Sequence, residues 1–248
     1  SAFLLNRSSI WPLNVVDNFW VAAVVGALAV GVVGAAIEFS AIRRLYDRVD
    51  SDLDQLIVTF GFVLVIHETV RFVWGSGSYS IDPPDVFNFS VTLGGSTFNA
   101  YRLVVIGLAV GVLAALWLFI TRTYFGSLVR GTSSDREMAA MLGVDVPRLY
   151  TGVFFLGSVL AGLGGALSAP LQSTSPALGD QVIIDAFIVV VIGGLGSMSG
   201  AFVGAMLIGM MQSLGPQFIS AGSIAIPFLA MVIVLLIRPE GLFGGIGE

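Results

Sequence analysis

The chain contains no cysteine and no lysine, and only 11% of its 248 residues are charged. The absence of cysteine excludes disulfides and thiolate metal sites. Because all 11 basic residues are arginine, the chain supplies neither the lysine of a P-loop nor a Schiff-base amine. If this chain takes part in a process driven by ATP, another chain must therefore hydrolyse the ATP. The formal charge is −5, and no run of basic residues predicts a nucleic-acid partner.

Hydrophobic residues make up 56% of the chain, and the mean hydropathy is +0.95. Soluble domains carry about 25% charged residues, so the composition indicates an integral membrane protein surrounded by membrane lipid. A spanning helix needs roughly 20 apolar residues. The predicted fold is all-α, a polytopic transmembrane helical bundle with short broken helices, forming a single domain over residues 1–248. The predicted spans are 19–37, 55–66 (continuing to 74), 103–121, 149–169, 183–193, 200–214 and 224–237.

The segments between these spans are polar. Residues 38–54 are predicted to form a charged loop, and the alternating apolar residues of 86–93 predict a small β-hairpin. Residues 1–18 form neither a spanning segment nor a signal peptide, and the first residue is serine. We therefore expect that an N-terminal portion is missing or was processed away.

The distribution of arginine predicts the orientation in the membrane. With alternating spans, one side receives eight arginines and the other receives Arg7, Arg71 and Arg102. The positive-inside rule places the larger group in the cytoplasm. A re-entrant hairpin at 183–200 would change the parity and move Arg238 outside, so the number of spans in this part stays open.

A short helix is predicted at 135–142, between two apolar runs. Ser134 and Glu137 have the spacing of a capping box, Gly143 is a natural C-terminal stop, and Pro147 is expected to prevent the helix from resuming. Two turns are too short to be stable alone in water. The helix is therefore either an interfacial link between spans or a docking element for a cytoplasmic protein. Its candidate contact residues are Asp135, Arg136, Glu137, Met138, Ala139, Ala140, Met141, Leu142 and Gly143.

An uncharged run begins at residue 186, and a glycine-rich break at 193–200 interrupts it. This break is either a tight turn that allows close helix packing or an unwound stretch whose backbone groups line a substrate path. Asp185, expected near the outer end of its span, is an ionisable residue in a membrane segment and therefore also a candidate. The candidate path residues are Asp185, Gly193, Gly194, Gly196, Ser197 and Gly200.

The single histidine lies beside two charged residues. We interpret His67, Glu68 and Arg71 as a solvated cluster at a helix end, because one histidine does not make a metal site. Pairing His67 with a serine of the glycine-rich break could be read as a serine protease, but nothing in the sequence orients the two groups. We expect no metal, no cofactor and no catalytic residue.

Several segments resemble one known family, in the same order. They are Arg130 to Gly143, ending Asp-Arg-Glu-Met-Ala-Ala-Met-Leu-Gly, the glycine-rich run 156–170, Asp185 to Gly200, and Arg-Pro-Glu-Gly-Leu-Phe-Gly at 238–244. From about residue 20 to 245 the chain resembles the permease subunits of bacterial ABC importers for branched-chain amino acids, whose relatives carry urea and amides. It differs at its start, where that family's first helices and its Ala-His-Gly-like segment are not present.

The resemblance implies a function and a set of partners. Residues 136–143 would be a cytoplasmic coupling helix seated in a cleft of an ATPase subunit. Two such ATPase subunits, a second permease subunit (identical or related), and an extracytoplasmic binding protein docking on loops 75–102 and 171–182 are implied, in a bacterial plasma (inner) membrane. The alternative is an ion-coupled secondary transporter or channel for a small polar solute, with Asp185, Glu68 and Glu38, all expected near helix ends, as its candidate coupling carboxylates.

Overall fold

The computed structural model describes residues 19–45, 51–80, 90–93, 96–194, 196–218 and 225–243. The chain divides into two compact units. The first contains Ser1–Glu68 and Ser78–Thr174, and the second contains Thr69–Gly77 and Ser175–Glu248.

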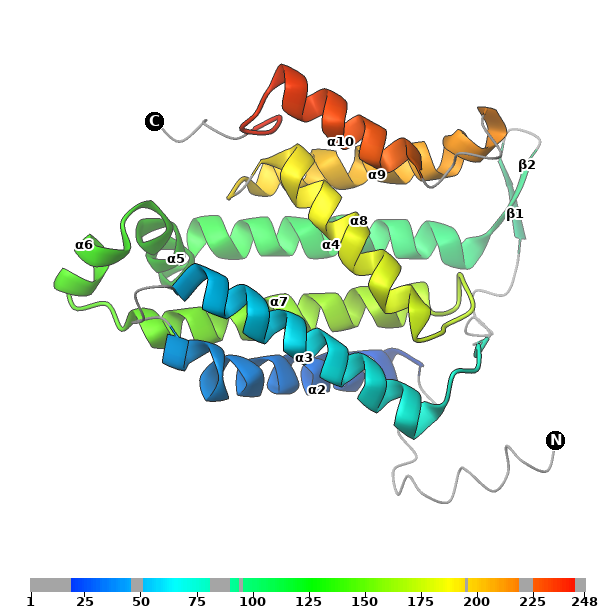
Figure 1. Cartoon of the computed structure of the whole chain (residues 1–248). Coiled ribbons are helices and arrows are strands. Elements are labelled where there is room, and N and C mark those ends of the chain that lie inside the picture. The colour runs from blue at the N-terminus through cyan, green and yellow to red at the C-terminus, as the bar shows by residue number, and fades with distance from the viewer. Residues whose placement is uncertain are drawn as a thin grey trace. The chain divides into compact units, whose positions relative to one another are not determined.

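The first unit is mainly helical and carries one β-hairpin before α4 (Figure 1). The last turns of α3, from Thr69, belong to the second unit. The elements in chain order are α2 (Phe19–Ser40), η3 (Ile42–Leu45), α3 (Ser51–Trp74), β1 (Ser90–Leu93), β2 (Ser96–Asn99), α4 (Ala100–Arg122), α5 (Tyr124–Ser134), α6 (Arg136–Met141) and α7 (Val146–Ser168).

Four helical segments among the described residues are long and apolar enough to cross a membrane. They are α2, the Ile57–Trp74 part of α3, α4 and α7. These segments confirm the polytopic helical membrane fold and the four predicted spans before residue 170. Shorter apolar helices cover Met198–Leu214 and Ile226–Ile237, so the full count of seven spans stays a prediction.

Small residues bring α2 and α7 close together along their lengths (Figure 1). A methyl group on Gly162 of α7 would lie 2.9 Å from the Cα of Ala27 on α2. On the α2 side, a methyl group on Gly31 would meet the side chains of Val159 and Phe155. In lipid, such close approach maximises van der Waals contact between helices. The seam therefore makes α2 and α7 one packed pair.

The N-terminal end of α4 joins this pair through a buried tyrosine. Asn99 caps α4 by accepting a hydrogen bond from the Tyr101 amide at 3.0 Å. The Tyr101 side chain is completely buried, and its hydroxyl donates to the Leu167 carbonyl oxygen at 2.9 Å. Its ring meets that of Phe19 edge to face, with 6.1 Å between centroids. Tyr101 therefore holds α2, α4 and α7 together at one end of the unit.

The hairpin predicted before α4 is present. Strands β1 and β2 pair antiparallel, with Ser90 opposite Asn99 and Leu93 opposite Ser96. The described strand thus begins at Ser90, inside the predicted run 86–93, and residues 81–89 lie outside the described part of the chain. Nearby, Tyr79 and Thr174 exchange two backbone hydrogen bonds, of 2.8 and 2.7 Å. The segments that follow α3 and α7 therefore meet on one side of the unit.

The second unit contains α8 (Ala177–Gly193), α9 (Met198–Phe218) and α10 (Ala225–Ile237). Its buried core is apolar and consists of Ile188, Ile192, Ile208 and Ala230. After α10 the chain returns to the end of α8, where the Leu242 and Phe243 amides donate to the carbonyl oxygens of Ile192 and Gly193 at 2.8 and 3.1 Å. The ends of α8 and α10 therefore lie together.

Two predicted boundaries were wrong. Helix α7 begins at Val146, three residues before the predicted span 149–169, so Pro147 lies in its first turn and does not block it. Proline fits there because the first amides of a helix have no intrahelical acceptor. Helix α8 begins at Ala177 and not at residue 183, so Asp185 lies near its middle and not near a helix end.

Candidate functional site

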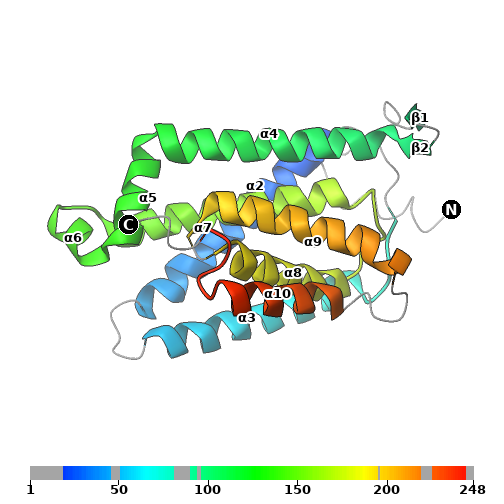
Figure 2. The same ribbon diagram turned by 90° about the horizontal axis from the view of Figure 1, so that it is seen from above.

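A sharp corner between α4 and α5 positions the candidate docking helix (Figure 2). Thr123 caps α5: its hydroxyl accepts from the Gly126 amide at 3.1 Å and donates to the Phe119 carbonyl oxygen at 2.6 Å. A side chain on Gly126 would overlap the backbone of Ile120. The Arg130 guanidinium also donates to the Ile120 carbonyl oxygen, which satisfies an orphan acceptor at the end of α4. The corner thus requires glycine and is held by polar contacts.

Helix α6 is a separately capped helix of six residues, Arg136–Met141. Its N-cap is Asp135, whose Oδ1 accepts from the Met138 amide at 2.9 Å. The prediction that Ser134 forms the cap was therefore wrong: Ser134 is the last residue of α5, and its hydroxyl donates to the Arg130 carbonyl oxygen. An aspartate cap also places a negative charge at the positive end of the helix dipole.

The C-terminal end of α6 is closed as predicted by Gly143. This glycine has φ +86°, in the left-handed region. The Val144 amide donates to the Ala139 carbonyl oxygen at 3.1 Å, and the Gly143 amide donates to that of Ala140 at 3.0 Å. These two bonds are those of a Schellman motif, which favours glycine at this position. The local sequence therefore determines both ends of α6.

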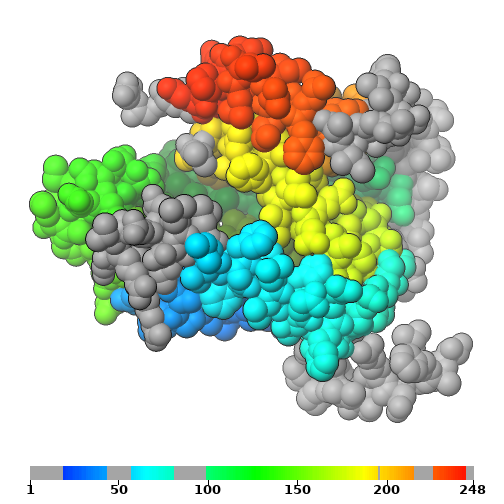
Figure 3. Space-filling view, viewed as in Figure 1, coloured from blue at the N-terminus to red at the C-terminus, as the bar shows by residue number. Residues whose placement is uncertain are grey.

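The large apolar side chains of α6 and of its C-cap residue Leu142 are exposed. Ala139 is buried at 8% exposure, whereas Met138, Met141 and Leu142 are 57%, 82% and 79% exposed. In the space-filling view the green α5–α6 segment projects at one end of the first unit (Figure 3). The two exposed methionines of α6 and the leucine that follows the helix form an adaptable apolar surface. We call these three residues the α6 apolar face.

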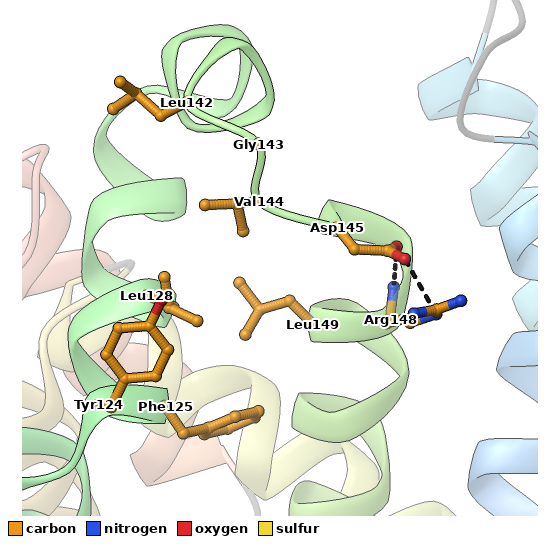
Figure 4. A pocket seen from close by; sticks show the side chains of 9 residues that line it. All are labelled: Tyr124, Phe125, Leu128, Leu142, Gly143, Val144, Asp145, Arg148 and Leu149. Carbon is orange, nitrogen blue, oxygen red and sulfur yellow. Dashed lines mark hydrogen bonds and ion pairs between the residues drawn. The ribbon is translucent and has the colours of Figure 1, made fainter.

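A shallow pocket lies beside this face, between α5 and α7 (Figure 4). Its volume is about 360 Å³. Leu128 of α5, Val144 of the connecting turn and Leu149 of α7 point into the space between the helices. The full lining is Tyr124, Phe125, Leu128, Leu142, Gly143, Val144, Asp145, Arg148 and Leu149. The α6 apolar face is therefore continuous with a concave surface through Leu142.

Charged residues surround the turn between α6 and α7. Asp145 caps α7 by accepting from the Arg148 amide at 3.1 Å, and its carboxylate lies 2.9 Å from the Arg148 Nε. Both side chains are exposed, so this ion pair contributes little to stability. On the other side, the Arg136 guanidinium lies 5.7 Å from the centroid of the Tyr150 ring, within the range of a cation–π interaction.

The glycine-rich break of the second unit is a tight corner between α8 and α9. Helix α8 ends at Gly193, and Gly194 and Gly196 have φ +96° and +82°. Ser197 caps α9, its hydroxyl oxygen accepting from the Gly200 amide at 3.0 Å. A side chain on either Gly193 or Gly200 would overlap the backbone of the other. The break is thus present as predicted, and the two helices cross at backbone contact there.

Asp185 of α8 faces α9. Its Oδ1 accepts a hydrogen bond from the side-chain nitrogen Nε2 of Gln212 at 2.8 Å. Asp185 is half-buried and Gln212 is exposed on the unit. A carboxylate at the middle of an apolar helix is costly to keep in a membrane unless it has polar contacts, and one carboxylate oxygen keeps further acceptor capacity. The pair can therefore accept a hydrogen bond from a small polar ligand.

Comparison with known proteins identifies the family. Residues 2–237 match the family model described as the permease component of branched-chain amino acid transport systems. This match covers most of the chain. The chain belongs to this permease family.

Individual relatives agree with this family assignment. The chain is 27% identical over 241 residues to the high-affinity branched-chain amino acid transport system permease protein LivH of Salmonella typhimurium, covering 92% of this chain and 77% of the relative. It is 33% identical over 183 residues to a probable branched-chain amino acid transport permease protein LivH of Methanocaldococcus jannaschii, covering 70% and 53%. The fructose import permease protein FrcC of Rhizobium meliloti is 31% identical over 163 residues, covering 63% and 44%. No solved structure matches the chain.

Two features of this permease were missed by the sequence analysis. Helix α5 was not predicted, although the apolar residues at 124, 125, 128 and 129 fall on one helix face and the polar residues fall on the other, a signal that could have found it. Glu38 was placed in a loop, but it lies in α2 and is completely buried. The sequence signal for placing Glu38 in a helix was the uninterrupted apolar run that precedes it. Among the described residues, no group of three or more His, Asp or Glu side chains is arranged to hold a metal ion.

Proposed function

We propose that this chain is the membrane-spanning subunit of an ATP-driven importer, translocating branched-chain or related hydrophobic amino acids delivered by an extracytoplasmic binding protein. The observation that carries the proposal is α6, a helix fixed by its own caps that leaves Met138, Met141 and Leu142 exposed. In this proposal the α6 apolar face docks in a cleft of a cytoplasmic ATPase subunit. Two ATPase subunits and a second permease chain, identical or related, complete the transporter in a bacterial plasma membrane.

The binding protein would dock on the opposite side. The backbone bridge between Tyr79 and Thr174 joins the segments after α3 and α7, which belong to the loops expected to face outward. Tyr79 is 45% exposed, and tyrosine is enriched at protein interfaces because it combines a large apolar area with a hydroxyl. These features support one continuous docking surface on that side of the first unit.

A test of this function uses the wild-type protein purified in mild detergent from its native membranes. We expect a nucleotide-binding subunit to co-purify and the reconstituted complex to take up leucine, isoleucine or valine only with ATP and a loaded binding protein. Fructose serves as the competing solute, because FrcC is a relative. If the chain alone moves substrate in liposomes, driven by an ion gradient and indifferent to ATP, it is a secondary transporter.

In the proposed substrate path, Asp185 makes the principal polar contact, and Gly193, Gly194, Gly196, Ser197 and Gly200 form the adjoining turn. Asp185 lies mid-helix and keeps acceptor capacity beyond its bond from Gln212. The ammonium group of an amino acid is a donor that suits this carboxylate. A hydrogen bond to a charged group contributes about 1.5–3 kcal/mol.

Asp185→Asn is therefore expected to lower ATP-dependent amino-acid uptake at limiting substrate about tenfold or more. Uptake by reconstituted complexes measures this, with subunit stoichiometry as the check on assembly. Asp180→Asn, in the exposed first turn of the same helix, is the matched control and should stay close to wild type. Adding Gln212→Glu to Asp185→Asn returns a carboxylate to the pair and is expected to restore part of the uptake. Uptake by Asp185→Asn equal to wild type would remove Asp185 from the path.

A further inference from the structure

Glu38 is the one fully buried charged side chain among the residues that the structure describes. It lies near the C-terminal end of α2. The Thr151 hydroxyl, in the second turn of α7, donates a hydrogen bond to the Glu38 Oε2 and also lies 3.0 Å from the Pro147 carbonyl oxygen. Removing a carboxylate from water is costly unless it is hydrogen-bonded or paired. The contact therefore ties the end of α2 to the start of α7.

The neighbouring residue on α7 contacts the docking helix. The Tyr150 ring lies 5.7 Å from the guanidinium carbon of Arg136, in the first turn of α6. Tyr150 and Thr151 are adjacent in the chain. The same turn of α7 therefore contacts α6 through the Tyr150 ring and α2 through the Thr151 hydroxyl. Along the chain, α6 is followed by α7 after the turn that contains Gly143.

Below this turn, α2 and α7 are packed at backbone distance. A side chain on Gly34 of α2 would overlap Ser158 of α7, and one on Gly162 of α7 would lie 2.9 Å from the Ala27 Cα of α2. Closely packed helices do not deform continuously and instead move as bodies. A displacement applied at the start of α7 is therefore shared by α2.

We infer that the contacts of Arg136 with Tyr150 and of Thr151 with Glu38 form a mechanical link, the α6–α2 link, through which movement of the docked α6 turns α7 and α2 as one body. The inference rests on the proposed function, because the movement comes from an ATPase subunit. In this link Tyr150, Thr151 and Glu38 are positioning residues: they touch neither substrate nor nucleotide. Without the link, the turn at Gly143 absorbs the movement of α6, and ATP is hydrolysed without transport.

The test measures substrate transported per ATP hydrolysed by the complete transporter in proteoliposomes. Tyr150→Leu removes the ring and Thr151→Val removes the hydroxyl, and each is expected to lower this ratio about tenfold, within the usual range of coupling between sites. Tyr150→Phe and Thr151→Ser keep the ring and the hydroxyl, and both should stay close to wild type. Subunit stoichiometry and the basal rate of ATP hydrolysis should be unchanged in all four variants.

Thr132→Val is the matched control for the loss of a buried hydroxyl. Thr132 is 3% exposed, and its hydroxyl has no hydrogen-bond partner among the described residues, so its removal should leave the transport ratio unchanged. If Tyr150→Leu assembles normally and keeps the wild-type ratio, the link does not exist, and this holds even if Thr151→Val fails to fold. Equal impairment of Thr151→Ser and Thr151→Val would also overturn it. A wild-type complex without ATP-dependent uptake would instead refute the proposed function.

Discussion

Replacing Met138 by aspartate and Met141 by arginine together is expected to release the ATPase subunit and abolish ATP-dependent uptake. The two methionine side chains are 57% and 82% exposed, so the change removes apolar contact area without opening a cavity. Aspartate in the first turn and arginine in the last turn suit the helix dipole, so α6 should still form. If each methionine anchors the contact with about 1.4 kcal/mol, the affinity falls about 100-fold.

The amount of ATPase that co-purifies with the double variant in mild detergent measures this loss. Met138→Leu with Met141→Leu keeps the apolar area and is the matched control, expected to retain the ATPase subunit. The thermal midpoint of the isolated permease should change little in both. Full retention of the ATPase by the Asp–Arg variant would exclude the α6 apolar face as the docking surface and leave α6 as an interfacial link.

The ends of α6 could be predicted from sequence because local chemistry determines them. Gly143 closes the helix, as expected from its position after Leu142. At the other end two adjacent residues, Ser134 and Asp135, are both good N-caps. The choice of Asp135 depends on α5, which extends to Ser134. Because α5 was not predicted, the cap was assigned one residue too early.

Helix α5 could not be derived from intrinsic propensity. It contains Gly126 and Gly131 and ends in Thr132, Ser133 and Ser134, all weak helix formers. Tertiary contacts compensate: Gly126 fits against the Ile120 backbone, and Arg130 donates to the Ile120 carbonyl oxygen. These contacts require the chain to turn back at Thr123, which no local pattern at the end of a long apolar span specifies.

The carboxylates illustrate a different limit. A hydropathy pattern ends a predicted span at the first charged or polar residues, so Glu38 was assigned to a loop and Asp185 to a helix end. In the structure α2 continues through Glu38, and α8 begins well before Asp185. Helices tolerate such residues where a partner is available, here Thr151 for Glu38 and Gln212 for Asp185. Those partners lie on other helices, so they become visible only once the helices are packed.

Gly200→Ala is expected to prevent stable packing of α8 against α9 and so to abolish transport. A methyl group on Gly200 would overlap the carbonyl group of Gly193, and Gly193 has no side chain that could move aside. Inserting a methyl group into a packed contact typically costs about 1–3 kcal/mol. We expect the upper end of that range or more, because backbone must shift while the Phe243 amide holds the Gly193 carbonyl oxygen at 3.1 Å.

Three glycines on α9 make a graded series that separates this steric effect from helix propensity. A methyl group on Gly204 would lie 2.7 Å from the Val189 carbonyl oxygen, whereas one on Gly209 would meet nothing within 4 Å. Alanine is a better helix former than glycine by about 1 kcal/mol, so Gly209→Ala should raise the thermal midpoint of the detergent-solubilised protein. Gly204→Ala should lower it, and Gly200→Ala should lower it most and reduce the amount of protein in the membrane. Equal midpoints for Gly200→Ala and Gly209→Ala would show that α8 and α9 do not meet at backbone contact.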